Sequence, residues 1–178
     1  AVLCVLLALA MLPCGASAKA KEAPKKEIAI QLYSVRTLIG SFGKNQQDYK
    51  PVLKALADMG YTAVEAASYK DGLLYGQTPE QFRKDVEAAG MKVLSTHCTL
   101  NLSDEELTAG DFSKALAWWD ECIAAHKAAG AEYIVVPSMR KITTLRDLGT
   151  YCRYFNEVGA RCKAAGMKFG YHNHSGEF

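Results

Sequence analysis

The sequence has no cluster of lysine and arginine residues, and no basic stretch interleaved with aromatic residues. Its 21 basic residues are nearly balanced by 19 acidic ones, which leaves a formal net charge of +2. Proteins that bind nucleic acids need a basic surface to contact phosphates. The composition therefore argues against a dedicated nucleic-acid partner.

Cysteine motifs are missing as well. Two of the six cysteines fall in the apolar start of the chain, and the other four are Cys98, Cys122, Cys152 and Cys162. They show neither a CxxC motif nor the spacing of a disulfide framework. An oxidising compartment would permit pairing, but the last three lie in expected helices. We therefore expect buried free thiols.

Strongly apolar sequence is concentrated at the start of the chain. Residues 1–10 are almost wholly apolar and lead to Ala16-Ser17-Ala18, a small-residue cleavage pattern. The run is too short to span a bilayer comfortably, and it is typical of a secretory signal peptide. An initiating Met and a preceding basic segment are absent. We predict a signal peptide over residues 1–18, a linker over residues 19–27, and an exported, periplasmic protein.

Cys14 leaves a second form of export open. Lipidation of this cysteine would make the protein a membrane-anchored lipoprotein. Pro13 directly before it, and Leu12 one place too close, do not fit a lipidation motif. Contact with a membrane is thus expected only if Cys14 is lipidated.

A repeat runs through the remaining sequence. Small residues followed by Gly60, Gly90, Gly130 and Gly166 end the expected helices, and a hydrophobic strand follows each at once. These glycines are 30, 40 and 36 residues apart. This spacing is that of βα units, and consecutive βα units form parallel sheets.

The expected elements follow from this punctuation. Strands are predicted over residues 28–34, 61–66, 91–96, 133–137 and 167–171. Helices are predicted to start near Pro51, to follow Thr78, to carry the stripe Phe112, Leu116, Trp119 and Ile123, and to span 144–165. Thr78-Pro79-Glu80-Gln81 matches a capping box, with Gln81 reaching back. Residues 40–47, and the stretch from Thr99 to the third helix, are expected to be loops.

The first strand distinguishes two architectures of parallel sheet. A dinucleotide-binding sheet would need glycines after this strand, and residues 31–36 contain none. The pattern therefore favours a (β/α)8 TIM barrel. Five units make only part of a barrel of ~250 residues. We therefore interpret residues 28–178 as a partial barrel, clipped at both ends and unable to turn over substrate alone.

Polar residues recur where the expected strands end, which is where TIM barrels place their active sites. They are Gln31, Tyr33, Glu65, His97, Ser138, and His172 to His174. For each a structural role competes: Glu65 could bond a neighbouring strand, His97 could be a satisfied inner histidine, and Gln31 could fill the barrel. By contrast, we expect His126 on the exposed face of a helix and the two tryptophans, Trp118 and Trp119, in helix packing.

The end of the chain carries the densest group of polar candidates. His172 and His174 are two residues apart beside the expected last strand, so they should point the same way, with Glu177 following. Two imidazoles and a carboxylate suit a divalent ion or an acid/base pair working near neutral pH. The alternative is that one histidine packs inside while the other bonds a carbonyl.

Several of these segments together resemble the xylose-isomerase-like TIM-barrel superfamily, in its exported sugar phosphate isomerase/epimerase branch. The resemblance rests on Ile30 to Arg36, Gly60-Tyr61 with Val64-Glu65, His97, and Tyr171 to His174 with Glu177-Phe178. It covers the chain from about Lys26 to its end.

This resemblance implies a divalent metal, either manganese, cobalt, magnesium or zinc, and a carbohydrate substrate. The metal polarises sugar oxygens while acid/base residues move a proton through an enediolate. Carried over residue by residue, only the last motif matches: His172 stands where many relatives place a carboxylate ligand, and Glu177 follows. The remaining ligands would belong to strands six to eight.

The resulting assignment has three groups. Catalytic candidates are His97, His172 and His174; substrate-binding candidates are Gln31, Tyr33, Glu65 and Asn173; metal-ligand candidates are Glu177 and His172. The function expected is a metal-dependent sugar isomerase or epimerase. A related lyase or hydrolase acting on oxidised glycosides, and a non-catalytic periplasmic carbohydrate-binding barrel, remain alternatives. An endonuclease on the same fold is disfavoured by the charge balance. The sequence leaves the oligomeric state open.

Overall fold

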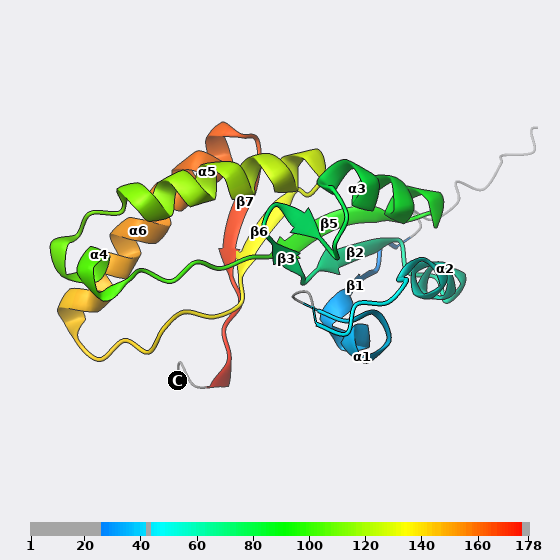
Figure 1. The fold of residues 1–178 in the computed structure, drawn as a ribbon, viewed down its shortest axis with the longest axis horizontal. Helices are drawn as coiled ribbons and strands as arrows, with labels where there is room; N and C mark the ends of the chain where they lie inside the picture. The colour runs from blue at the N-terminus through cyan, green and yellow to red at the C-terminus, as the bar shows by residue number, and fades with distance from the viewer. Residues whose placement is uncertain (1–25, 42–43, 176–178) are drawn as a thin grey trace, which may run out of the picture.

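The computed structural model describes residues 26–41 and 44–175, and within them five parallel strands form one sheet (Figure 1). In spatial order they are β1 (Ala29–Gln31), β2 (Ala63–Ala66), β5 (Lys92–His97), β6 (Tyr133–Val136) and β7 (Lys168–Tyr171). Each strand is added at the same edge as its predecessor. A doubly wound sheet reverses its strand order at a switch point, so the sequential order confirms the predicted barrel architecture, as part of a TIM barrel.

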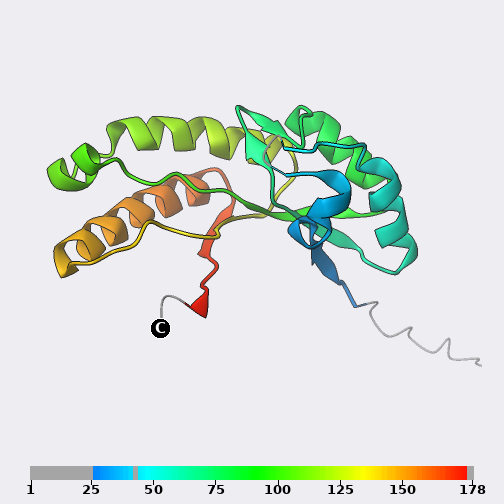
Figure 2. The same ribbon diagram turned by 60° about the horizontal axis from the view of Figure 1, so that its bottom comes forward.

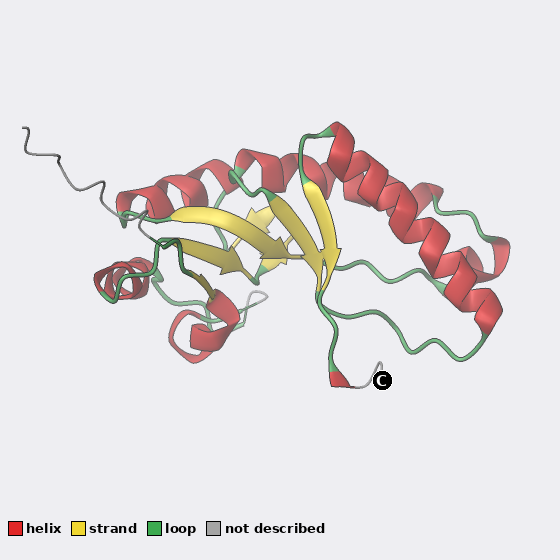
Figure 3. Cartoon of the chain, turned by 180° about the vertical axis from the view of Figure 1, so that it is seen from behind, coloured by secondary structure: helices red, strands yellow, loops and turns green. Residues whose placement is uncertain are grey.

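Long helices connect the strands and lie together on one side of the sheet (Figure 2). They are α2 (Lys50–Asp58), α3 (Pro79–Ala88), α5 (Ser113–Ala128) and α6 (Leu145–Ala164). The opposite side of the sheet faces the viewer in Figure 3, with the long helices around and behind it. We call the first side the helix face and the second the inner face.

The core fills the space between the sheet and these helices. Ile134 of β6, Trp119 of α5 and Tyr154 of α6 are each fully buried. The Trp119 indole Nε1 donates a hydrogen bond to the Tyr154 hydroxyl at 2.6 Å, so two polar atoms inside the core satisfy each other. The predicted packing role of Trp119 is confirmed.

The four helix-ending glycines have φ between +79° and +99°. This left-handed region strains residues that carry a Cβ, so glycine suits the position. The residue after each glycine donates its N–H to the carbonyl five residues back, as Tyr61 does to Leu56 and Met91 to Val86. These are Schellman ends. They turn the chain directly from each helix into the next strand, as the spacing predicted.

Shorter elements depart from the sequence prediction. The first strand ends at Gln31, because a 3-10 turn, η1 (Leu32–Val35), follows it and buries Leu32 completely. A short helix, α1 (Arg36–Ile39), comes next. The segment after Ala66 contains an unpredicted hairpin of β3 (Tyr69–Lys70) and β4 (Leu73–Leu74). The expected loop after Thr99 contains helix α4 (Asp104–Ala109).

One capping prediction is half right. The Thr78 hydroxyl accepts a hydrogen bond from the backbone N–H of Gln81, at 3.3 Å. The Gln81 side chain does not return to Thr78; it donates to the Asp85 carboxylate at 2.9 Å. A charged acceptor one turn along the helix makes the stronger bond. The full capping box occurs instead at α4, between Ser103 and Glu106.

Two further expectations are wrong. His126 is fully buried rather than solvated, because its side of α5 faces the sheet and the Tyr69 ring, 4.5 Å between centroids. Cys152 is exposed, whereas Cys98, Cys122 and Cys162 are buried free thiols as predicted. Within the described residues, no helix combines the length and the apolar character needed to cross a membrane.

Candidate active site

Strand register brings three polar residues side by side on the inner face. Gln31 of β1 pairs with Glu65 of β2, and Glu65 pairs with Ser95 of β5. The pairing of β2 with β5 shifts by one residue at this point: Val64 pairs with Val93, and the next pair is Glu65 with Ser95. Leu94 is thus the extra residue of a β-bulge. Bulges re-aim side chains next to functional sites, and this one sets Ser95 beside Glu65.

Hydrogen bonds join these residues to His97 at the end of β5. Gln31 Nε2 donates to Glu65 Oε1 at 2.7 Å, and His97 Nε2 lies 3.0 Å from the same oxygen. The Ser95 hydroxyl donates to the other carboxylate oxygen, Oε2. Gln31 Nε2 also lies 3.2 Å from His97 Nε2. We call Gln31, Glu65, Ser95 and His97 the inner-face network.

Glu65 is the charged centre of this network. Burial alone would raise the pKa of its carboxyl, but the hydrogen bonds from His97, Ser95 and Gln31 outweigh burial and lower the pKa to about 2. Glu65 is therefore ionised at neutral pH. Both of its oxygens accept bonds from neighbouring side chains, so the carboxylate holds its neighbours in place.

The ionised carboxylate also selects the tautomer of His97. An ionised carboxylate only accepts hydrogen bonds, so a proton on His97 Nε2 completes the 3.0 Å contact with Glu65. In the neutral ring the lone pair is then on Nδ1. The His97 side chain is only 8% exposed, so the network fixes its orientation.

Two further imidazoles extend the network toward solvent. The His172 ring meets the His97 ring edge to face at 5.2 Å between centroids, and His174 stacks on His172 at 4.7 Å. β7 ends at Tyr171, so both residues follow the strand rather than belong to it. Their rings nevertheless share one side. His172 is half-buried and His174 exposed.

The remaining predicted site residues lie apart from the network or outside the described chain. Tyr33 is 41% exposed on η1, with the Arg36 guanidinium 4.3 Å from its ring centroid. Asn173 is exposed between the two histidines. Glu177 falls outside the residues that the structure describes. A cavity of about 700 Å³ opens beside His174, lined by the β6–α6 connection from Met139 to Leu145.

Sequence reasoning missed Ser95. Strict alternation along β5 assigns Ser95 to the same face as Val93, whose side chain is part of the core. The bulge at Leu94 breaks that alternation and turns Ser95 to Glu65. Its spacing of two from His97 was the available signal, since residues at i and i+2 share a face.

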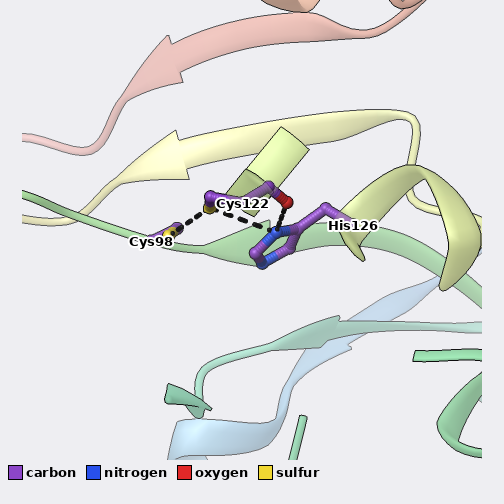
Figure 4. A group of neighbouring side chains, drawn as sticks. All are labelled: Cys98, Cys122 and His126. Atoms are coloured by element: carbon purple, nitrogen blue, oxygen red, sulfur yellow. Dashed lines mark hydrogen bonds between the residues drawn. The ribbon is translucent and has the colours of Figure 1, made fainter. Parts of the chain in front are cut away.

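Side chains whose donor atoms are close enough together to hold a metal ion lie outside the inner-face network, in another part of the described chain. There, one group of three side chains brings its donor atoms within 4.8 Å of one another: Cys98, Cys122 and His126 (Figure 4). The inner-face network forms no such group, because only Glu65 and His97 among its four members are of the metal-ligating types, and both Glu65 oxygens accept side-chain bonds. Among the strand-end residues that the structure describes, His172 and His174 offer imidazole nitrogens for a divalent ion, and they belong to no such group of three.

Comparison with known proteins identifies relatives of this fold. No curated protein matches the chain. Two solved structures of sugar phosphate isomerases/epimerases from Parabacteroides distasonis share 28% and 31% identity with it, with TM-scores of 0.70 and 0.72. They cover 89% and 86% of this chain, which spans 55% and 56% of theirs.

A more distant structure, the IOLI protein with a bound zinc atom, shares 12% identity at a TM-score of 0.59. It covers 82% of this chain, which spans 51% of its length, and it shows the fold alone. The family model of the xylose isomerase-like TIM barrel matches residues 53–178. That match agrees with the strand order, and the chain belongs to the xylose isomerase-like TIM barrel family.

Proposed function

We propose that the protein containing this chain is a sugar isomerase or epimerase that moves a proton between adjacent carbons. The observation that carries the proposal is the inner-face network, in which Glu65 holds His97 and His97 meets His172. The two relatives from Parabacteroides distasonis, described as sugar phosphate isomerases/epimerases, support the substrate class. The chain spans just over half their length, so the activity is proposed for the whole protein.

The geometry suggests a division of labour among the histidines. His97 is nearly enclosed and fixed by Glu65, so it acts as a positioning residue for the ring beside it. His172 is half-buried at the edge of the network and is placed to touch a substrate. A neutral imidazole at this position would accept a proton from a sugar carbon and return it to the neighbouring carbon.

A divalent metal belongs to this proposal as the resemblance implies it, with zinc, manganese, cobalt and magnesium as the candidates. When bound, such an ion polarises the oxygens of a sugar and stabilises developing negative charge. His174 would supply an imidazole nitrogen, and oxygen ligands would come from outside the described residues, while His172 would keep its lone pair for the proton. The zinc in the IOLI protein is consistent with a metal in this fold.

Solvent exchange at carbon tests the activity directly. The full-length protein, supplied with each of the four metals in turn, is incubated in heavy water with a panel of ketoses, aldoses and their phosphates. We expect deuterium to be incorporated at the carbon next to the carbonyl, and nuclear magnetic resonance measures its incorporation over time. His172→Ala should reduce the exchange by ~100-fold or more. Lys84→Ala, an exposed change on α3, should leave it unchanged.

Other outcomes identify the alternatives. Binding of a sugar without exchange or turnover would reject the enzyme and leave a carbohydrate-binding barrel. Elimination or glycoside cleavage, without epimerised product, would point to a lyase or hydrolase. Full exchange by the His172→Ala protein would reject the role given to His172 while keeping the activity.

The cellular location also stays a proposal. We propose that the protein is exported to the periplasm, on the strength of the apolar run that ends in Ala16-Ser17-Ala18. Those residues lie outside the described part of the chain. Cell fractionation of the natural host, with mass spectrometry of the mature N-terminus, tests both cleavage and lipidation at Cys14.

A further inference from the structure

Three polarisable side chains, Cys98, Cys122 and His126, meet between the end of β5 and helix α5 (Figure 4). Cys98 follows His97 at the end of β5, while Cys122 and His126 stand one turn apart on α5. All three are buried, with at most 5% of any of them exposed. The Cys98 and Cys122 sulfur atoms are 2.9 Å apart. A disulfide bond is about 2.05 Å long, so an approach of ~0.9 Å would join them.

The environment of His126 argues for the sulfur pair rather than for a metal held by all three groups. His126 Nδ1 lies 2.6 Å from the carbonyl oxygen of Cys122 and 3.3 Å from its sulfur. A carbonyl only accepts, so Nδ1 carries the proton, and a protonated nitrogen cannot bind a metal. The other nitrogen, Nε2, has no partner in the described chain and lies on the side of the ring away from the drawn contacts.

We propose that Cys98 and Cys122 form a disulfide that fixes the carboxyl end of β5 to α5. The inference does not depend on the proposed sugar chemistry. The bond would close a loop between residues 24 apart in the sequence. Because Cys98 directly follows His97, the bond would anchor the backbone on which the inner-face network ends.

The reaction is an exchange with a small-molecule or protein disulfide. The two thiols lose two protons and two electrons and become joined, and the sulfur–sulfur bond of the oxidant breaks to give two thiols. Burial, and then the contact with Cys98, raise the pKa of the Cys122 thiol far above its usual range. Thiolate is the reacting form and is therefore scarce in the folded protein. The bond consequently forms while the chain folds, before both sulfurs are covered.

Refolding of the full-length protein tests the pair. The reduced, denatured protein is refolded with a mixture of oxidised and reduced glutathione, alkylated, and digested for peptide mapping. We expect one cross-linked peptide that joins Cys98 to Cys122, and a melting temperature roughly 5–15 °C above that of the reduced protein. Folded, reduced protein should form the same cross-link at least about tenfold more slowly than refolding protein.

Variants and controls separate this pair from the other thiols. Cys98→Ala and Cys122→Ala should each abolish the cross-link, whereas Cys162→Ser, which changes another buried thiol, should keep it. If a variant fails to fold, the peptide map of the unaltered protein still shows whether Cys98 and Cys122 are cross-linked. Alkylation of both cysteines after oxidative refolding would overturn the proposal. So would a cross-link through Cys152 or Cys162, or a bound metal ion that shields both thiols in the native protein.

Discussion

The carboxylate of Glu65 holds the candidate site together. Three side chains donate to its two oxygens, and Gln31 and Ser95 reach it because they stand opposite it in the sheet. A glutamine at this position keeps the size of the side chain but presents an amide N–H to one of these donors. An unsatisfied or repelling buried polar group costs about 1–3 kcal/mol.

We therefore expect Glu65→Gln to lower the free energy of unfolding by about 1–3 kcal/mol in urea titrations at pH 7. It should also lower solvent exchange at carbon by about tenfold or more, since the His97 tautomer is no longer selected. Glu157→Gln, an exposed change on α6, is the matched control. Unchanged stability in the Glu65 variant would mean that the network is not held together by this carboxylate.

His126 gives a second residue-scale prediction, this time for pH. Burial lowers the pKa of its imidazole to about 4, an effect that the hydrogen bond to the Cys122 carbonyl only partly offsets. The imidazole binds a proton near pH 6.5 in the unfolded chain but only near pH 4 in the folded one. The free energy of unfolding is therefore independent of His126 above pH 6.5 and falls as the pH drops from 6.5 toward 4.

We expect His126→Phe to flatten this dependence. The phenyl ring has no site for a proton, and it removes from the core the His126 Nε2, which has no hydrogen-bond partner among the described residues. Between pH 6.5 and 4 the natural protein should lose about 2–3 kcal/mol more stability than the variant. Urea titrations at several pH values measure the difference. Parallel curves for the two proteins would show that His126 does not remain neutral in the fold.

At the scale of elements, glycine punctuation predicted most of the fold. Each helix-ending glycine supports a Schellman end, so helices and the strands that follow them were placed within a few residues. Short elements were missed because too few residues are involved to show periodicity. Helix α4 has six residues and buries none of them, so it shows no apolar periodicity from which a helix could be predicted. Its signal was the capping box of Ser103 and Glu106.

The two capping segments should respond differently to alanine. Glu106 accepts hydrogen bonds from the backbone N–H of Ser103 at 3.0 Å and of Ala115 at 3.1 Å, so it joins α4 to the start of α5. Glu106→Ala should cost about 1 kcal/mol or more in urea titrations. Gln81→Ala should stay within ~0.5 kcal/mol, because Gln81 is exposed and Asp85, which its side chain bonds, still accepts a hydrogen bond from the Tyr49 hydroxyl. Equal costs would contradict this account of α4.

The sequence predicted several residues of the candidate site, but not the hydrogen bonds that join them. Strand ends named Gln31, Glu65 and His97, because barrels collect polar groups there. The donor from Ser95 depends on the bulge, and a bulge has no signature in alternation alone. The burial of His126, by contrast, had a signal in the helix itself: His126 stands three residues after Ile123 and seven after Trp119, on the stripe that is buried.

At the scale of the whole molecule, two groups on opposite faces of the sheet make the fold sensitive to acid. The pKa of Glu65 is lowered to about 2 and that of His126 to about 4. In both cases the unfolded chain takes up its proton at higher pH than the folded one. Stability should therefore fall from pH 6.5 through His126, and from about pH 4.5 down to 2 through Glu65.

Because the sheet separates the two groups, their effects should add. At pH 4 the double variant Glu65→Gln/His126→Phe should differ in stability from the natural protein by the sum of the single changes, within about 0.5 kcal/mol. Urea titrations of the four proteins complete the cycle. A coupling well above that value would mean that the inner-face network and the Cys98–Cys122 cluster communicate across β5.

The bulge at Leu94 changes which residues of β2 and β5 stand opposite one another for the rest of the two strands. Before it, the pairing of β2 with β5 sets Val64 beside Val93; after it, Glu65 stands beside Ser95. In a chimaera whose β5 came from a relative and paired regularly with β2, Glu65 would stand beside the residue at position 94 instead of the one at position 95. Such a protein could keep its helices, core and strand order while its carboxylate lost the Ser95 donor. When strands are aligned or transplanted within this family, one unpaired leucine therefore matters as much as the polar residues themselves.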